Sequence, residues 1–285
     1  IADVRAAYRD YPGYLEYCRR AADLIQDAWE PSEPTYIGIQ LKLVDGIRLN
    51  FRYEEALNVL KDLRKKLETS VVLPSVQASI INSEATVYQH WGLYAEAIRL
   101  YTEASVLVKV AFGEKHPDVA IYLGNAASSH TDFGQYDRAL KLYIELERLR
   151  EAIYDAPHLA VESTHNWAGH VLDARGSYKE AIKTYMNAYQ KGKKIVGEKN
   201  PIVAIFLANS ASSYKNLGQY SKALELYAEV RRLREAIYGA SHLEIANTIN
   251  MVAWVFDAGK SHKEAIANFM AAYQMGKETV GEKHP

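Results

Sequence analysis

The sequence predicts an all-α fold, a right-handed superhelical solenoid of helix-turn-helix repeats, because its residues recur at a fixed interval of 42. Tyrosine stands at Tyr94, Tyr136, Tyr178 and Tyr220. Alanine follows three residues later, at Ala97, Ala139, Ala181, Ala223 and Ala265. Glycine precedes each tyrosine by two positions, at Gly92, Gly134, Gly176 and Gly218. A period of this length is typical of identical units stacked in a row, each contacting only its neighbours.

Each unit is predicted to hold two helices. His116-Pro117 and Asn200-Pro201 indicate helix starts, because proline is tolerated in the first turn and asparagine caps well. The first helix then carries an apolar stripe from Val119 onward at three- and four-residue spacing, and Gly134 permits the turn that ends it. The second helix has Tyr136 and other large apolar residues on one face. We expect these tyrosines to be core residues.

The chain is predicted to contain about six repeats after an N-terminal helical segment, degenerate repeat or cap at 1–34. The predicted repeats span 35–74, 75–116, 117–158, 159–200, 201–242 and 243–285. Residues Gly281 to Pro285 repeat the loop that elsewhere begins a new unit at Gly113. We therefore expect the chain to be part of a longer array.

The order Gly-x-Tyr-x-x-Ala-x-x-x-Tyr, with Pro117 and Pro201 placed 17 residues before Gly134 and Gly218, resembles the tetratricopeptide repeat. The period is about eight residues longer than the usual 34. This lengthened form is similar to the repeats of kinesin light chains and nephrocystin-like proteins, and the resemblance covers roughly residues 35–285. It implies a non-catalytic scaffold that binds an extended peptide or a partner helix in a concave groove. An adaptor is one form of such a scaffold. The alternative is a sensor or assembly array of a larger signalling ATPase.

The resemblance also implies that the first helices form the inner wall of the groove. Asparagine falls on this wall in five repeats, alternating between two adjacent positions, at Asn82, Asn125, Asn166, Asn209 and Asn250. Each amide offers a donor and an acceptor, which suits an extended peptide backbone. Capping of local backbone groups, or ties between adjacent first helices, is the structural alternative.

Further candidate groove residues are Trp167, His170, Lys215, Met251 and Trp254. The aromatic side chains and Met251 would supply apolar pockets, since buried aromatic anchors often dominate binding energy. Packing between helices is the alternative. Lys42 and Arg48 share the wall with Asp132, Asp173 and Asp257, so the preferred charge of the ligand stays open.

Composition narrows the partners to protein or peptide. A formal net charge of -1 supplies no electrostatic footprint for nucleic acid or an anionic membrane. The single cysteine and the lack of an Asn-x-Ser/Thr sequon favour the cytoplasm. Gly259-Lys260-Ser261 imitates a phosphate loop but has Trp254 where glycine is needed, and the histidines lack metal-ligand spacing. We expect no enzyme activity, no cofactor and no metal.

Overall fold

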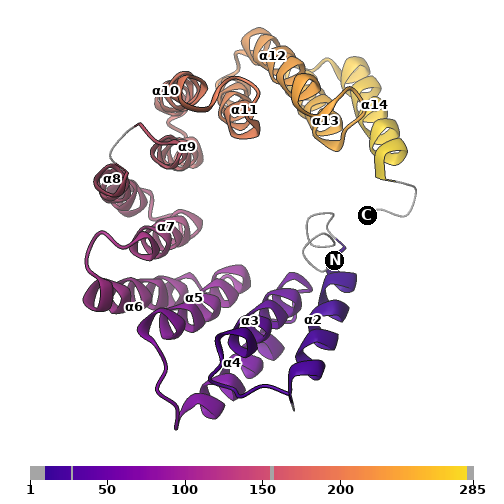
Figure 1. Cartoon of the computed structure of the whole chain (residues 1–285). Helices are drawn as coiled ribbons and strands as arrows, with labels where there is room; N and C mark the ends of the chain where they lie inside the picture. The colour runs from indigo at the N-terminus through magenta and orange to yellow at the C-terminus, as the bar shows by residue number, and fades with distance from the viewer. Residues whose placement is uncertain (1–9, 27, 155–156, 281–285) are drawn as a thin grey trace. The chain divides into compact units, whose positions relative to one another are not determined.

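A computed structural model describes residues 10–26, 28–154 and 157–280 (Figure 1). These residues form thirteen α-helices and no strand, so the predicted all-α fold is confirmed. The predictions that involve residues 1–9 and Gly281 to Pro285 fall outside the described residues.

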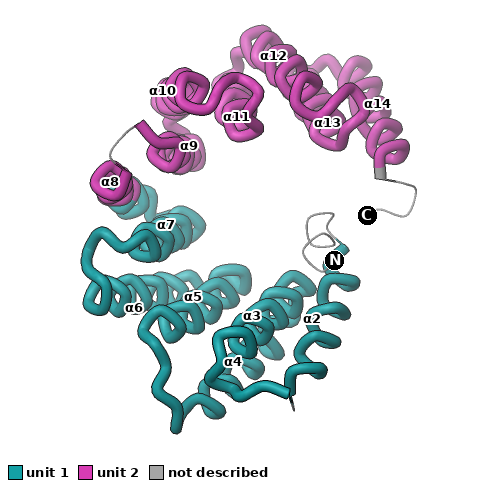
Figure 2. Tube along the Cα trace, in the orientation of Figure 1, with its two compact units in different colours: residues 1–142 teal, residues 143–285 magenta. Residues whose placement is uncertain are grey.

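The helices belong to two compact units, residues 1–142 and 143–285 (Figure 2). The boundary falls within α8 (Tyr136–Ile153). Unit 1 holds α2 (Tyr11–Ile25), α3 (Pro34–Leu49), α4 (Tyr53–Leu67), α5 (Pro74–Trp91), α6 (Tyr94–Phe112), α7 (Pro117–Asp132) and the start of α8. Unit 2 holds the rest of α8, α9 (Leu159–Ala174), α10 (Tyr178–Val196), α11 (Pro201–Asn216), α12 (Tyr220–Tyr238), α13 (Leu243–Ala258) and α14 (His262–Val280).

From α3 onward the odd-numbered helices are the first helices and the even-numbered helices the second helices of helix-turn-helix pairs. In unit 1, α3 packs on α4 and α5 packs on α6. In unit 2, α9, α11 and α13 pack on α10, α12 and α14. First helices also contact one another, α3 with α5 and α11 with both α9 and α13. In the repeat division that we propose from the sequence, each repeat would contain one such pair.

Two kinds of cap begin the first helices. Pro117 and Pro201 are the first residues of α7 and α11, as the sequence predicted. The Asn200 side chain accepts a hydrogen bond from the Ile202 backbone N–H at 3.0 Å. Histidine does the same before α7, α9 and α13, and of these three helices only α7 begins with proline.

The turns inside the repeats use left-handed backbone. Gly92 has φ 85°, a conformation that glycine adopts without a Cβ penalty. The last repeat differs, because Gly259 has φ -80° while Lys260, in the glycine column, has φ 63°. Phe51, which replaces glycine before Tyr53, has φ 60°. The repeat geometry therefore overrides the residue preference at both positions.

The core is formed by the periodic alanines and by a second tyrosine column, which lies seven residues after Tyr94, Tyr136, Tyr178 and Tyr220. Tyr101, Tyr185 and Tyr227 are at most 2% exposed, and burial raises the pKa of Tyr101 to about 12. Small residues face them on the first helices, where Ala85, Ala127, Ala211 and Ala253 are fully buried. Gly169 is the exception in this column, because a Cβ there would lie 2.7 Å from the Tyr185 ring. The tyrosines that open the second helices are only partly buried, at Tyr94, Tyr136, Tyr178 and Tyr220, so the prediction that they are core residues is wrong for that column.

Candidate peptide-binding face

Each unit has a first-helix face, which is the surface formed by its own predicted groove residues, on α5 and α7 in unit 1 and on α9, α11 and α13 in unit 2. In unit 1, Asn125 Nδ2 donates to Asn82 Oδ1 at 2.9 Å, joining α7 to α5. In unit 2, Asn209 Nδ2 donates to Asn166 Oδ1 at 2.9 Å, joining α11 to α9. These four amides therefore tie adjacent first helices. Each amide still has donor or acceptor capacity that this single bond does not use.

Asn250 on α13 differs from the other four asparagines. It is half-buried, and its side chain forms no hydrogen bond to another described residue. Its place in the 84-residue pattern matches that of Asn82 and Asn166, each of which accepts from the following first helix. Among the described residues, Asn250 is thus the one predicted amide whose side chain does not join two first helices.

The aspartates on this face are also used for bracing. Gln89 of α5 donates to Asp132 of α7 at 2.7 Å. Asn216 of α11 donates to Asp173 of α9 at 3.2 Å, and Ser213 donates to the same carboxylate. These acids are therefore engaged by neighbouring first helices, which reduces their availability to a charged ligand.

Large apolar side chains remain accessible on the face in unit 2. Trp167 is 49% exposed, Met251 41% and Trp254 48%. The Trp167 ring lies edge-on to His170 with centroids 6.2 Å apart, and Trp254 lies edge-on to Phe269 of α14 at 5.1 Å. Lys215 lies half-buried in the last turn of α11, where a cation complements the helix dipole. These residues both pack locally and present apolar surface.

Two exposed apolar residues and a small cavity on this face were not predicted from the sequence. Ile121 on α7 is 50% exposed and Ile205 on α11 is 42% exposed. They lie 84 residues apart in one column of the 42-residue period. The other positions of this column hold serine or asparagine, and this alternation can be seen in the sequence. In unit 1, a cavity of about 290 Å³ is lined by Leu41, Lys42, Asp45, Ser79, Asn82, Ser83 and Thr86.

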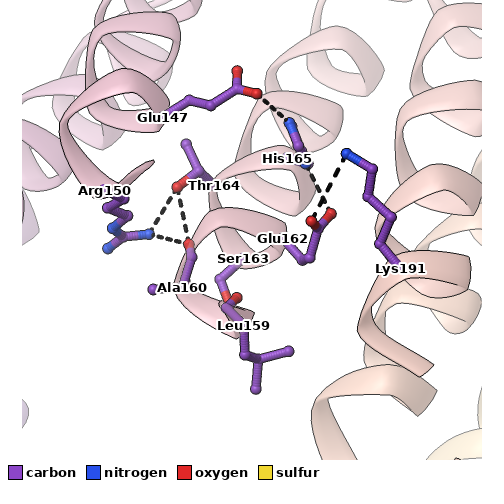
Figure 3. Close-up of polar contacts among 9 residues, drawn as sticks. All are labelled: Glu147, Arg150, Leu159, Ala160, Glu162, Ser163, Thr164, His165 and Lys191. Carbon is purple, nitrogen blue, oxygen red and sulfur yellow. Dashed lines mark hydrogen bonds and ion pairs between the residues drawn. The ribbon is translucent and has the colours of Figure 1, made fainter. Parts of the chain in front are cut away.

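A charged cluster in unit 2 was missed as well (Figure 3). His165 of α9 places Nε2 2.7 Å from Glu147 Oε1 of α8 and Nδ1 2.9 Å from Glu162 Oε2. Lys191 Nζ of α10 lies 3.9 Å from Glu162 Oε1. Glu162 is only 3% exposed. The hydrogen bonds of His165 with Glu162 and with Glu147 raise the pKa of His165 above its ordinary value, because a protonated ring donates from both nitrogens.

Three members of this cluster interrupt apolar columns of the 42-residue period. The Glu162 column otherwise contains Ala78, Ala120, Ala204 and Ala246. The His165 column contains Ile81, Leu123, Leu207 and Ile249. The Lys191 column contains Leu107, Leu149, Leu233 and Met275. A comparison of each column for departures from its consensus would have found the cluster.

Two searches of the described residues gave negative results. None of their helices is long and apolar enough to cross a membrane. No group of three or more His, Cys, Asp or Glu residues among them is arranged to hold a metal ion.

Comparison with known proteins identifies the repeats. A family model described as tetratricopeptide repeat matches residues 76–152 and 203–278, more than half of the chain. The chain belongs to the tetratricopeptide repeat family. Repeats of this family typically form non-catalytic scaffolds for protein interaction, and this supports the predicted class of function. A search of curated protein sequences found no match.

Solved structures share the fold. The repeats of a kinesin light chain-like protein from Podospora anserina superpose with a TM-score of 0.59 at 18% identity, covering 72% of this chain and 96% of that one. NprR in complex with its cognate peptide NprX gives 0.58 at 15% identity, covering 97% and 79%. A Rap protein complexed with competence and sporulation factor gives 0.53 at 14% identity, covering 94% and 86%. The tetratricopeptide solenoid predicted from the sequence is therefore confirmed.

Proposed function

We propose that the chain is an adaptor that binds an extended peptide of a partner protein on its first-helix face. The observation that carries this proposal is the accessible apolar surface of Trp167, Met251 and Trp254, which lies on the same helices as the amides. Apolar peptide side chains would cover these residues, and the remaining amide groups would bond the peptide backbone. The solved complex of NprR with its cognate peptide NprX, which shares the fold, supports a peptide as the class of ligand.

The contacts on the face also favour a peptide whose anchors are apolar rather than charged. Asp132 and Asp173 already accept hydrogen bonds from adjacent first helices. A charged ligand would have to compete with those bonds, whereas an apolar side chain only has to cover exposed rings. We therefore propose that apolar contacts supply most of the affinity.

The test begins with peptides selected from a random display library on the whole chain, followed by fluorescence anisotropy of a labelled selected peptide. Trp167→Ala should weaken binding at least about tenfold, because truncation of an aromatic anchor costs more than about 1 kcal/mol. Met270→Ala removes an apolar side chain that is more exposed than Trp167 from a second helix, α14, and should leave affinity unchanged. Equal losses in the two variants would contradict binding on the first-helix face.

The amides are tested by a matched pair of variants with the same labelled peptide. Asn209→Ala leaves Asn166 without its donor, so it should lower the free energy of unfolding by about 1 kcal/mol as well as the affinity. Asn250→Ala breaks no brace among the described residues and should lower affinity alone. If Asn250→Ala leaves affinity unchanged, the amides are structural and the apolar side chains act without them.

A further inference from the structure

Unit 2 contains a cavity of about 570 Å³ that is separate from the first-helix face. It lies among the end of α8, the start of α9 and the end of α10. Its walls are Glu151, Tyr154, Pro157, His158, Val161, Glu162, Lys191, Lys194 and Ile195. This volume is within the usual range for small-molecule sites, and none of the predicted groove residues lines it.

The cavity exists because Lys191 stands where the repeat pattern places a large apolar side chain. In the next repeat the same position holds Leu233, which is 2% exposed and packs in one core cluster with Val203 and Ala204. The Lys191 side chain is 50% exposed. A lysine keeps its ammonium in water, so it cannot fill the gap that a leucine fills. Because lysine stands here in place of leucine, no side chain closes the space between α9 and α10.

The walls combine an apolar lining with hydrogen-bond donors. Val161, Ile195 and Pro157 are apolar, and the Tyr154 ring stacks on His158 with centroids 3.8 Å apart. His158 Nδ1 accepts a hydrogen bond from the Ala160 backbone N–H, so the neutral ring carries its proton on Nε2 and offers a donor there.

Two ammonium groups accompany that donor. Lys191 lies 3.9 Å from Glu162, beyond hydrogen-bond range, and Lys194 has no partner among the residues that the structure describes. The negative charge of Glu162 is already bound by His165. Glu151 is exposed on the α8 side, so an anion would be directed toward the lysines of α10.

We propose that this cavity binds a small ligand that carries an aliphatic group next to a carboxylate. The aliphatic group would fill the space that the missing leucine leaves, and the carboxylate would pair with Lys191 and Lys194. Both requirements follow from the walls, because an uncharged aliphatic ligand would leave Lys194 without a counter-ion and Lys191 with only its long ion pair to Glu162, and a small anion would leave the cavity empty. The site is independent of peptide binding on the first-helix face.

The probe is N-acetyl-leucine, titrated into the whole chain and followed by NMR chemical shifts of the Val161 and Ile195 methyl groups. N-acetyl-leucine should bind saturably. N-acetyl-leucinamide, which has no charge, and N-acetyl-glycine, which has no aliphatic side chain, should each bind at least about tenfold more weakly. Equal binding of the amide would overturn the carboxylate requirement, and no saturable binding of N-acetyl-leucine would overturn the site.

Three variants place the ligand in the cavity. Lys191→Leu restores the residue type of the column, so it should close the cavity and abolish binding while the chain stays folded. Lys194→Gln should weaken binding about tenfold without closing the cavity. Lys183→Gln, on an exposed part of α10 outside the cavity, is the control and should bind as the wild type does. Undiminished binding by Lys191→Leu would refute this location.

Discussion

The junction between α8 and α9 and the junction between α12 and α13 lie 84 residues apart in the sequence, and both belong to unit 2. An arginine joins the two helices in each case. Arg150 Nη1 donates to the Ala160 carbonyl at 2.7 Å and to Thr164 Oγ1 at 2.8 Å. In the second junction, Arg234 Nη1 donates to the Glu244 carbonyl and to Thr248 Oγ1, both at 2.9 Å.

The loops of the two junctions match as well. Tyr154 stacks on His158 and Tyr238 on His242, with interplanar angles of 10° and 9°. Each histidine accepts a hydrogen bond from the second backbone N–H after it, at 3.1 Å and 3.2 Å. The arginine, the stacked rings and the cap therefore form one framework that is used twice.

The junctions differ in the charged cluster. Glu162 and His165 in the first correspond to Ala246 and Ile249 in the second. Because the second junction packs with apolar side chains at these positions, the framework does not require the charges. A buried ion pair is weak evidence for stability. The difference therefore points to a role for the cluster other than folding, which is consistent with the adjoining cavity.

The largest expected effect comes from removing His165 alone. His165→Leu installs the residue type of its column but leaves Glu162 buried without its hydrogen bond. The free energy of unfolding at neutral pH should fall by about 3 kcal/mol, as for other buried pairs that lose one partner. Urea denaturation followed by circular dichroism measures it.

The matched control replaces three members of the cluster by the residue types of the next repeat, Ala204, Leu207 and Leu233. Glu162→Ala with His165→Leu and Lys191→Leu should recover the wild-type stability or exceed it, because no buried charge remains. If the triple variant is as unstable as His165→Leu, the cluster is needed for packing and the two junctions are not equivalent.

A smaller effect should appear when pH is varied. The folded-state pKa of His165 is raised by its hydrogen bonds to Glu162 and Glu147. Its contribution to stability is therefore fully present below the unfolded-state pKa of about 6.5, and is lost as pH rises through the folded-state pKa. The slope between these values is at most about 1.4 kcal/mol per pH unit.

The measurement compares wild type with the triple variant across this range. As pH rises, the free energy of unfolding of the wild type should fall relative to that of the triple variant. His90 has a pKa lowered by burial, which gives the opposite trend, but it is present in both proteins and cancels. A difference that stays constant with pH would contradict the proposed pairing of His165.

The smallest effect is expected from the caps. His158→Asn and His242→Asn keep a capping side chain of the kind that Asn200 uses, but they lose the stack on tyrosine. Each should lower the free energy of unfolding by less than about 1 kcal/mol. Hydrogen exchange at the Ala160 and Glu244 amides measures the two junctions separately. Unequal effects would show that the histidine cap stabilises one junction more than the other.

The sequence predicted what repeats and missed what departs from the repeat. Pro117 and Pro201 mark helix starts because their effect is local, and the column of Ala97 marks the core because every unit needs a small residue there. Ties between first helices were only the structural alternative for the amides in the sequence, since the two asparagines of each pair belong to different helices 43 residues apart. Lys260 shows a further limit, because the fold imposes a left-handed backbone that its residue type does not favour.

The amide pairs have a consequence for how such an array can be lengthened. Asn82 meets Asn125 and Asn166 meets Asn209, whereas Gly124 and Trp167 occupy the same two positions in the intervening step. Insertion or loss of 84 residues would keep every amide facing an amide. A change of 42 residues would set Asn82 against Trp167. Duplication, deletion and engineered extension are therefore expected to preserve the contacts of this array only when they proceed by whole double repeats.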